Sequence, residues 1–208
     1  QETVRNLTNK TFVGIEAFME RETRRYGVPI PRPIRIDIGQ PVATQPPAPP
    51  DSRNPVRVAL WSLGLRWWAW RSTRDQPGAT PDIRLFLVYH DPELRPRVPH
   101  SLGMREGLIG VVHVFADRRM HKQNNVVIAH EMLHTLGASD KYSPDDNLPL
   151  YPIGFAEPDR EPRYPQSSAE IMGGRIPLSA TEAVIPDSLR DVRVGPYTAL
   201  EIRWIEAL

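Results

Sequence analysis

The 208-residue chain contains no cysteine, which removes several kinds of chemistry at once. Disulfides, thiol nucleophiles and thiolate metal ligands are excluded, so any metal ion must be held by histidines and carboxylates. No apolar run reaches the roughly 18 residues that a transmembrane helix needs, so we expect no transmembrane segment. Net charge is also lacking, because 26 Lys and Arg offset 25 Asp and Glu to leave +1. So balanced a chain has no general attraction to phosphate, and we expect no nucleic-acid partner.

Proline, by contrast, is abundant, with 23 copies, about twice its ordinary frequency. This excess indicates long ordered loops. The length and an apolar fraction of 40% suit one domain with a hydrophobic core of its own. The first residue is Gln1 rather than a methionine, as after removal of a leader or propeptide. We expect an extracytoplasmic location, secreted or periplasmic.

The first part of the chain combines regular patterns with a proline-rich tether. Apolar residues recur at helical spacing over residues 2–26, which predicts an N-terminal helix within residues 1–27. Ile34, Ile36 and Ile38 alternate with polar residues, which predicts a half-buried strand over residues 33–40. Residues 41–55 are too rich in proline for either structure and predict an extended linker.

The middle of the chain carries the strongest apolar patterns. Residues 56–73 fit both a strand and a helix period, and we favour a helix. Continuous apolar runs predict buried strands at residues 83–89 and 108–115, with a short edge strand near Leu102. Two further helices are predicted at residues 124–136 and 196–204. Residues 141–169 hold six prolines and no periodicity. A compact domain keeps so long a loop mainly for function.

One segment, HEMLHTLGASD from His130 to Asp140, carries the chemistry. His130 and His134 are four residues apart on a predicted helix, so both side chains lie on one face and reach one metal ion. Glu131 lies beside them, where a carboxylate serves as a general base. The alternative is a polar helix face with two incidental histidines.

A catalytic zinc ion takes three protein ligands and keeps a fourth position for water. Asp140 follows the second histidine by six residues, and on a continued helix it would point away from the metal. Gly137 can adopt the left-handed conformation that ends a helix, which would turn the chain back toward the ion. Two alternatives remain open: Asp140 caps or pairs with Lys141, or the third ligand is Glu157 or Glu170.

This segment resembles the HExxHxxGxxH motif of the metzincin clan of zinc peptidases. With Asp140 in the last position it is closest to the snapalysin-like variant, HExxHxxGxxD. The resemblance implies one zinc ion on His130, His134 and Asp140, with Glu131 as the general base. In that clan a methionine-containing turn follows, and here the segment SSAEIMGG offers Met172. An ordinary core methionine is the alternative.

The order of the predicted elements also fits that clan. The resemblance implies an α/β fold of the α+β kind, with a twisted mixed sheet, an active-site helix, a Met-turn and a C-terminal helix. A single catalytic domain would cover residues 1–208. Its N-terminal subdomain would span residues 33–137. Its C-terminal subdomain, residues 138–208, would hold the proline-rich loop, the Met-turn and the last helix.

The implied activity is hydrolysis of peptide bonds in a protein or peptide substrate. The metal ion would polarise the carbonyl and acidify its bound water, while Glu131 takes the proton. We expect the substrate to lie along the edge strand near residues 101–104. Several members of the clan use a tyrosine two residues after the methionine, but this chain has Gly174 there. Three other tyrosines are candidates for stabilising the oxyanion: Tyr142, Tyr151 and Tyr164. The alternative function is a weak or inactive zinc-stabilised binding module with a peptidase-like fold.

The helix predicted at residues 56–73 is apolar most of the way round. Trp67 and Trp70 share one face, and Trp61 and Trp68 share another. We favour burial of this helix between the sheet and the N-terminal helix. The alternative is a partner or membrane surface at Trp61 and Trp68.

Overall fold

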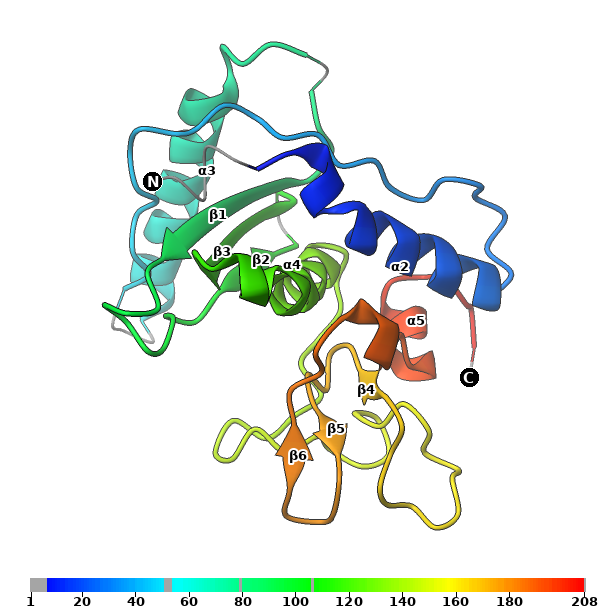
Figure 1. Cartoon of the computed structure of the whole chain (residues 1–208). Helices are drawn as coiled ribbons and strands as arrows, with labels where there is room; N and C mark the ends of the chain where they lie inside the picture. Colours follow the sequence, from blue (N-terminus) through cyan, green and yellow to red (C-terminus); the bar gives the residue numbers. More distant parts are fainter. Residues whose placement is uncertain (1–6, 51–53, 79, 106, 208) are drawn as a thin grey trace.

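The computed structural model describes residues 7–50, 54–78, 80–105 and 107–207. Its centre is a three-stranded sheet in the order β1-β3-β2 (Figure 1). β1 (Arg84–His90) and β3 (Ile109–Phe115) run parallel, and β2 (Leu102–Met104) pairs antiparallel with β3 at the edge. The predicted mixed sheet and edge strand are confirmed. β1 is half-buried along its whole length rather than buried as predicted.

Helices cover the two faces of this sheet (Figure 1). Val112 and Val114 of β3 belong to the core that α4 (His121–Thr135) and α2 (Val13–Arg25) complete on one face. Phe86 of β1 pairs with Val111 and points to the other face. There the ring of Trp68 in α3 (Pro55–Thr73) packs on it at 4.5 Å between centroids. The predicted helices at residues 56–73 and 124–136 are confirmed. The fold is mixed α/β, compatible with an α+β class.

The N-terminal helix is shorter than its apolar spacing predicts. A 3-10 turn, η1 (Asn9–Thr11), precedes α2, and Thr8 closes it by accepting from Thr11 N–H at 2.8 Å and donating to the Thr11 hydroxyl at 3.3 Å. These hydrogen bonds stop the α-helix from extending toward the N-terminus. Residues 2–6 of the predicted helix lie outside the described part of the chain.

The prediction of a strand at residues 33–40 is wrong. The segment is extended but pairs with no strand. Its backbone donates to side chains instead, with Ile36 N–H bound to Glu16 at 2.8 Å and Gln40 N–H bound to Gln76 at 3.0 Å. This segment and β1 line the same wide cavity. Alternating apolar residues make a strand only where another strand supplies the hydrogen bonds, and here none does.

Most of the chain that follows α4 lies below that helix in Figure 1. As predicted, residues 141–168 contain no helix. Short strands follow, with β4 (Ala169–Glu170) parallel to β7 (Val192–Arg193) and β5 (Ile176–Pro177) antiparallel to β6 (Ala183–Val184). Two 3-10 turns, η2 (Arg118–Met120) and η3 (Leu189–Asp191), precede α4 and β7. The last helix, α5 (Pro196–Glu201), ends three residues before the predicted Trp204, and Arg203 beyond it has a φ of +62°.

The prediction that α3 is deeply buried is wrong, and so is the choice of its outward face. Trp61 and Trp68 face the rest of the molecule, with their indole N–H groups bound to Pro47 O and to the Thr44 hydroxyl, each at 2.9 Å. Trp67 and Trp70 are the exposed pair. The reason is the layer order, because α2 packs against α4 on the opposite face of the sheet and leaves the outer side of α3 uncovered. Among the described residues, no helix is both long and apolar enough to cross a membrane.

Candidate metal centre

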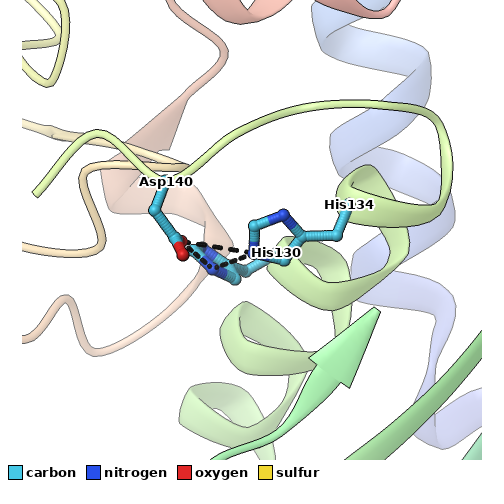
Figure 2. A group of neighbouring side chains, drawn as sticks. All are labelled: His130, His134 and Asp140. Atoms are coloured by element: carbon cyan, nitrogen blue, oxygen red, sulfur yellow. Dashed lines mark hydrogen bonds and ion pairs between the residues drawn. The ribbon is translucent and has the colours of Figure 1, made fainter. Parts of the chain in front are cut away.

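Three side chains converge at the C-terminal end of α4 (Figure 2). His130 and His134 lie on successive turns, and their Nε2 atoms are 3.1 Å apart. Oδ1 of Asp140 lies 3.1 Å from Nε2 of His130 and 3.2 Å from Nε2 of His134. Among the described residues, this is the one group of three or more His, Asp or Glu side chains close enough to hold a metal ion.

Hydrogen bonds on the far side of each ring set the tautomers. Nδ1 of His130 lies 2.9 Å from Ile171 O, and Nδ1 of His134 lies 2.8 Å from Ala138 O. A carbonyl oxygen only accepts, so each Nδ1 carries the proton and each neutral ring turns its Nε2 lone pair toward Asp140. Two lone pairs and a carboxylate oxygen then meet within about one hydrogen-bond length. Such a donor set is stable with a cation, or a proton, between its atoms, and it could hold a metal ion.

The turn after α4 brings Asp140 back to the histidines. Gly137 has a φ of +105°, in the left-handed region that favours glycine. Its N–H donates to His134 O at 3.0 Å, and Ala138 N–H donates to Leu133 O at 3.0 Å. This pair of bonds is the Schellman arrangement that ends a helix with glycine. The predicted helix stop at Gly137 is confirmed.

The loop that carries Asp140 is anchored on both sides by Glu201 of α5. The Glu201 carboxylate accepts from Ser139 N–H at 2.9 Å and from the Lys141 ammonium at 2.6 Å. Lys141 is only 1% exposed, and its own N–H donates to Met172 O at 2.9 Å. Asp140 is therefore not the ion-pair partner of Lys141, which the sequence left open.

Asp140 itself is only half-buried, with 46% of its side chain exposed. Burial would raise its pKa, but in the metal-free chain protonated His130 and His134 rings would donate hydrogen bonds to it, which outweigh burial and hold the pKa well below its usual range. Burial would likewise lower the pKa of His134, but hydrogen bonds to Asp140 and Ala138 raise it overall. Without a metal ion, the carboxylate and the protonated rings therefore stabilise one another's charged forms. A metal ion bound between them would take the place of the Nε2 protons.

Glu131 points into the same region and is nearly fully buried, at 7% exposure. Burial raises the pKa of its carboxyl, although His130 and His134 pull it down and the Gly103 N–H donates to it. Its Oε2 has no hydrogen-bond partner. A buried carboxylate oxygen left unpaired costs stability, so its presence beside the cluster marks a group available to hydrogen-bond a bound water or ligand.

The two alternative third ligands lie elsewhere. Glu170 is completely buried and uses both oxygens structurally, accepting from backbone N–H groups and from a hydroxyl: Met172, Gly173, Gly195 and the side chain of Thr198. Glu157 binds Arg160 and Ser167 at the surface. Neither belongs to the group that could hold a metal ion.

Met172 lies in a tight turn that contacts His130 of α4 through the Ile171 carbonyl. The turn is closed by Gly174 N–H bound to Glu170 O at 2.9 Å, with Gly174 at a φ of +71°. Met172 is fully buried, and the preceding residue supplies the carbonyl that orients His130. The turn therefore contacts both the helix that carries the histidines and, through Lys141, the loop that carries Asp140.

Of the three candidate tyrosines, the structure brings one to the cluster. The ring of Tyr142 lies 6.4 Å from that of His130. Burial, the charges of Asp140 and Glu131, and a hydrogen bond with Asp140 raise its pKa to about 12. Tyr151 and Tyr164 instead pack edge-on against one phenylalanine ring, that of Phe155.

Several residues that build this centre have no signal in the sequence. Gly103 of β2 passes so close to α4 that a Cβ there would lie 2.3 Å from Glu131 O. Glu201 and the carbonyl of Ile171 act from distant parts of the chain. Comparisons of the chain with protein-family models, with curated proteins and with solved structures gave no match. The chemistry of the centre is therefore the basis for assigning a function.

Proposed function

We propose that this protein is a zinc-dependent endopeptidase, with His130, His134 and Asp140 as ligands and Glu131 as the general base. The single observation that carries the proposal is a pre-oriented three-ligand cluster next to a buried, half-unpaired glutamate. Tetrahedral zinc with bonds of about 2.0–2.1 Å separates its ligand atoms by about 3.3 Å. The observed separations of 3.1–3.2 Å are close to that value. Two imidazoles also favour zinc over calcium or magnesium, which prefer oxygen ligands.

The protein groups divide the work of hydrolysis among them. A zinc ion bound here would act as a Lewis acid and lower the pKa of a bound water. Glu131 accepts the proton of the attacking water on Oε2 and passes it to the leaving amine. Burial, by raising the pKa of Glu131, brings the carboxyl closer to the range in which one group can both accept and donate. Tyr142, the candidate tyrosine whose ring lies near that of His130, would donate a hydrogen bond to the developing oxyanion.

A metzincin-type assignment rests on three features taken together. The glycine-terminated helix and its returning loop provide the third ligand. The turn at Met172 contacts both ligand-bearing segments, through His130 and through Lys141. A mixed sheet with an antiparallel edge strand packs on the helix of the histidines. This combination supports the family that the motif resembles.

The substrate would be an extended protein or peptide segment. β2 lies at the edge of the sheet and packs on α4 beside Glu131. A peptide that pairs with β2 would pass its carbonyls across the cluster. We expect a photo-crosslinking peptide hydroxamate to label residues 101–104 and the segment after Met172. Labelling confined to other surfaces would contradict this placement.

The test of the function measures metal and cleavage together. The purified chain is expected to bind one equivalent of zinc and to cleave an unfolded protein. Glu131→Gln should keep the zinc and lose about 10²–10⁴-fold in turnover, because the amide cannot take the proton.

The controls separate the two functions. Zinc binding without cleavage by the wild type would favour the alternative, a zinc-stabilised binding module. A chain that takes up no zinc even when it is supplied would refute both. Glu157→Gln, which changes a surface glutamate outside the cluster, should behave as the wild type.

A further inference from the structure

The outer side of α3 presents a continuous apolar stripe to solvent. Its members follow one another at alternating intervals of four and three residues, which keeps them on one face of the helix. Their exposed fractions are Val56 64%, Leu60 64%, Leu63 59%, Trp67 58% and Trp70 55%. We call these five residues the outer stripe. It runs for roughly 21 Å along the helix at 1.5 Å per residue.

The surroundings of the outer stripe are basic. α3 contains no Asp or Glu. Arg57 and Arg71 are exposed on the helix, and Arg74 follows at its C-cap with an ion pair to Asp75 at 3.0 Å. The guanidinium of Arg71 lies 5.5 Å from the Trp67 ring centre. That of Arg74 lies 5.3 Å from Trp70. Cations therefore sit beside the apolar surface with one carboxylate among them.

We propose that the outer stripe binds the surface of a membrane that contains anionic phospholipids. A helix with aliphatic and tryptophan side chains on one face and flanking arginines lies in the bilayer interface, with its apolar side among the acyl chains. Indole rings favour the headgroup level, and arginines reach the lipid phosphates along their apolar stems. The inner side of α3 is already held by Leu65, Ala69 and Trp68, so the helix offers the outer stripe without unfolding.

A second copy of the chain fits this surface less well. The four-and-three spacing is that of a coiled-coil seam, so pairing of two α3 helices is the obvious competitor. Such a pair would bring arginines together with no carboxylate on either helix to offset them. It would also place two tryptophans at successive core positions, where aliphatic residues pack better. The charge of the surface favours lipid phosphates over a copy of itself.

The test uses the full chain and vesicles that differ only in charge. We expect the chain to sediment with vesicles of phosphatidylcholine and phosphatidylglycerol in equal parts at a salt concentration of about 0.15 M. Binding should weaken at higher salt and on phosphatidylcholine alone. The double variant Trp67→Ala/Trp70→Ala should lose at least about tenfold in vesicle affinity. Arg71→Gln/Arg74→Gln should lose about tenfold on the anionic vesicles.

Matched controls keep the result interpretable. Leu94→Ala removes another exposed apolar side chain, 80% exposed and outside the stripe, and should bind as the wild type. Thermal unfolding of each variant should match that of the wild type, because the substituted side chains are exposed. No sedimentation of the wild type, or equal binding by the Trp67→Ala/Trp70→Ala and Leu94→Ala variants, would overturn the proposal. A dimer that Trp67→Ala/Trp70→Ala dissociates, in a chain that ignores vesicles, would assign the outer stripe to a second copy.

Discussion

The cluster of His130, His134 and Asp140 at the end of α4 and the outer stripe of α3 depart from the ordinary distribution of side chains in opposite directions. Around the cluster, charged groups are buried: Glu131, Lys141 and Glu170 are all under 10% exposed. Along α3, large apolar groups are in water. Both departures cost free energy in the isolated chain. The two regions differ in how much of that cost is recovered within the molecule.

Hydrogen bonds offset most of the free-energy cost of burying these charges. Nothing in the described chain covers the outer stripe, so the cost of its exposure is not offset. Lys141 and Glu170 have partners for their charged atoms. Glu131 keeps one oxygen without a partner, and the outer stripe keeps its whole face uncovered. The unrecovered costs, rather than the buried charges as such, identify the places where a ligand is expected.

The largest expected difference in stability is between substitutions of the two buried glutamates, Glu170 and Glu131. Glu170→Ala leaves four buried donors without an acceptor and should lower the free energy of unfolding by about 4 kcal/mol or more. Glu131→Ala removes a carboxylate that is itself short of a partner, so the metal-free chain should lose little or gain slightly. Chemical denaturation of both metal-free variants measures the difference. Equal losses would show that the unpaired oxygen of Glu131 is satisfied in solution.

The next effect concerns the ligand that the sequence left uncertain. Asp140→Ala should weaken zinc binding by more than the roughly 10–100-fold that loss of a ligand's hydrogen-bond partner costs. Asp140→His should retain the ion, because an imidazole is also a zinc ligand. Competition with a chromogenic chelator gives the affinities. Asp145→Ala, an exposed carboxylate in the same loop, is the control. Wild-type affinity in Asp140→Ala would move the third ligand elsewhere.

A smaller effect compares a glycine from each region. Gly137→Ala puts a side chain at a φ of +105° and within 3.3 Å of Arg105, which should cost about 1–2 kcal/mol of stability. Gly64, in the middle of α3, has nothing within 4 Å of a Cβ. Gly64→Ala should therefore stabilise the chain by about 0.5–1 kcal/mol through helix propensity. Thermal unfolding that shifts both variants in the same direction would contradict this contrast.

The smallest effect is a pH dependence at the anchor of the Asp140 loop. Burial would raise the pKa of Glu201, but hydrogen bonds from Lys141 and Ser139 outweigh it and lower the pKa below its ordinary 4.5. A lowered folded pKa means that the stabilisation is present above pH 4.5 and is lost as the pH falls through the folded value. The stability difference between the wild type and Glu201→Gln should therefore shrink in acid. A difference that grows below pH 4.5 would contradict this assignment.

The sequence predicted best what neighbours along the chain decide. The helix of the histidines and its end at Gly137 depend on four- and three-residue spacings, and both are confirmed. The prediction of a strand at residues 33–40 was wrong because a strand forms only with a partner strand, which no local pattern supplies.

The prediction of which face of α3 points outward was wrong for a related reason. A helix that is apolar all round does not say which side a neighbour covers, and α2 lies on the other face of the sheet. The carbonyl that orients His130 comes from a residue 41 positions away, so spacing carried no sign of it. Contacts between distant segments are therefore what the sequence could not supply for either region.

The anchor of Lys141 on Glu201 also sets the order in which this centre can be completed during synthesis. The two residues are 60 positions apart, and the carboxylate of Glu201 accepts from Ser139 N–H and from the ammonium of Lys141, which also donates to Ser139 O. A nascent chain that has already formed α4 therefore presents both histidines before the Ile171 carbonyl that orients His130 and the Glu201 carboxylate that anchors the Asp140 loop have been synthesised. We expect the position of Asp140 to become fixed only once α5 has been synthesised and has folded back, so the last helix rather than the HExxH segment completes the cluster.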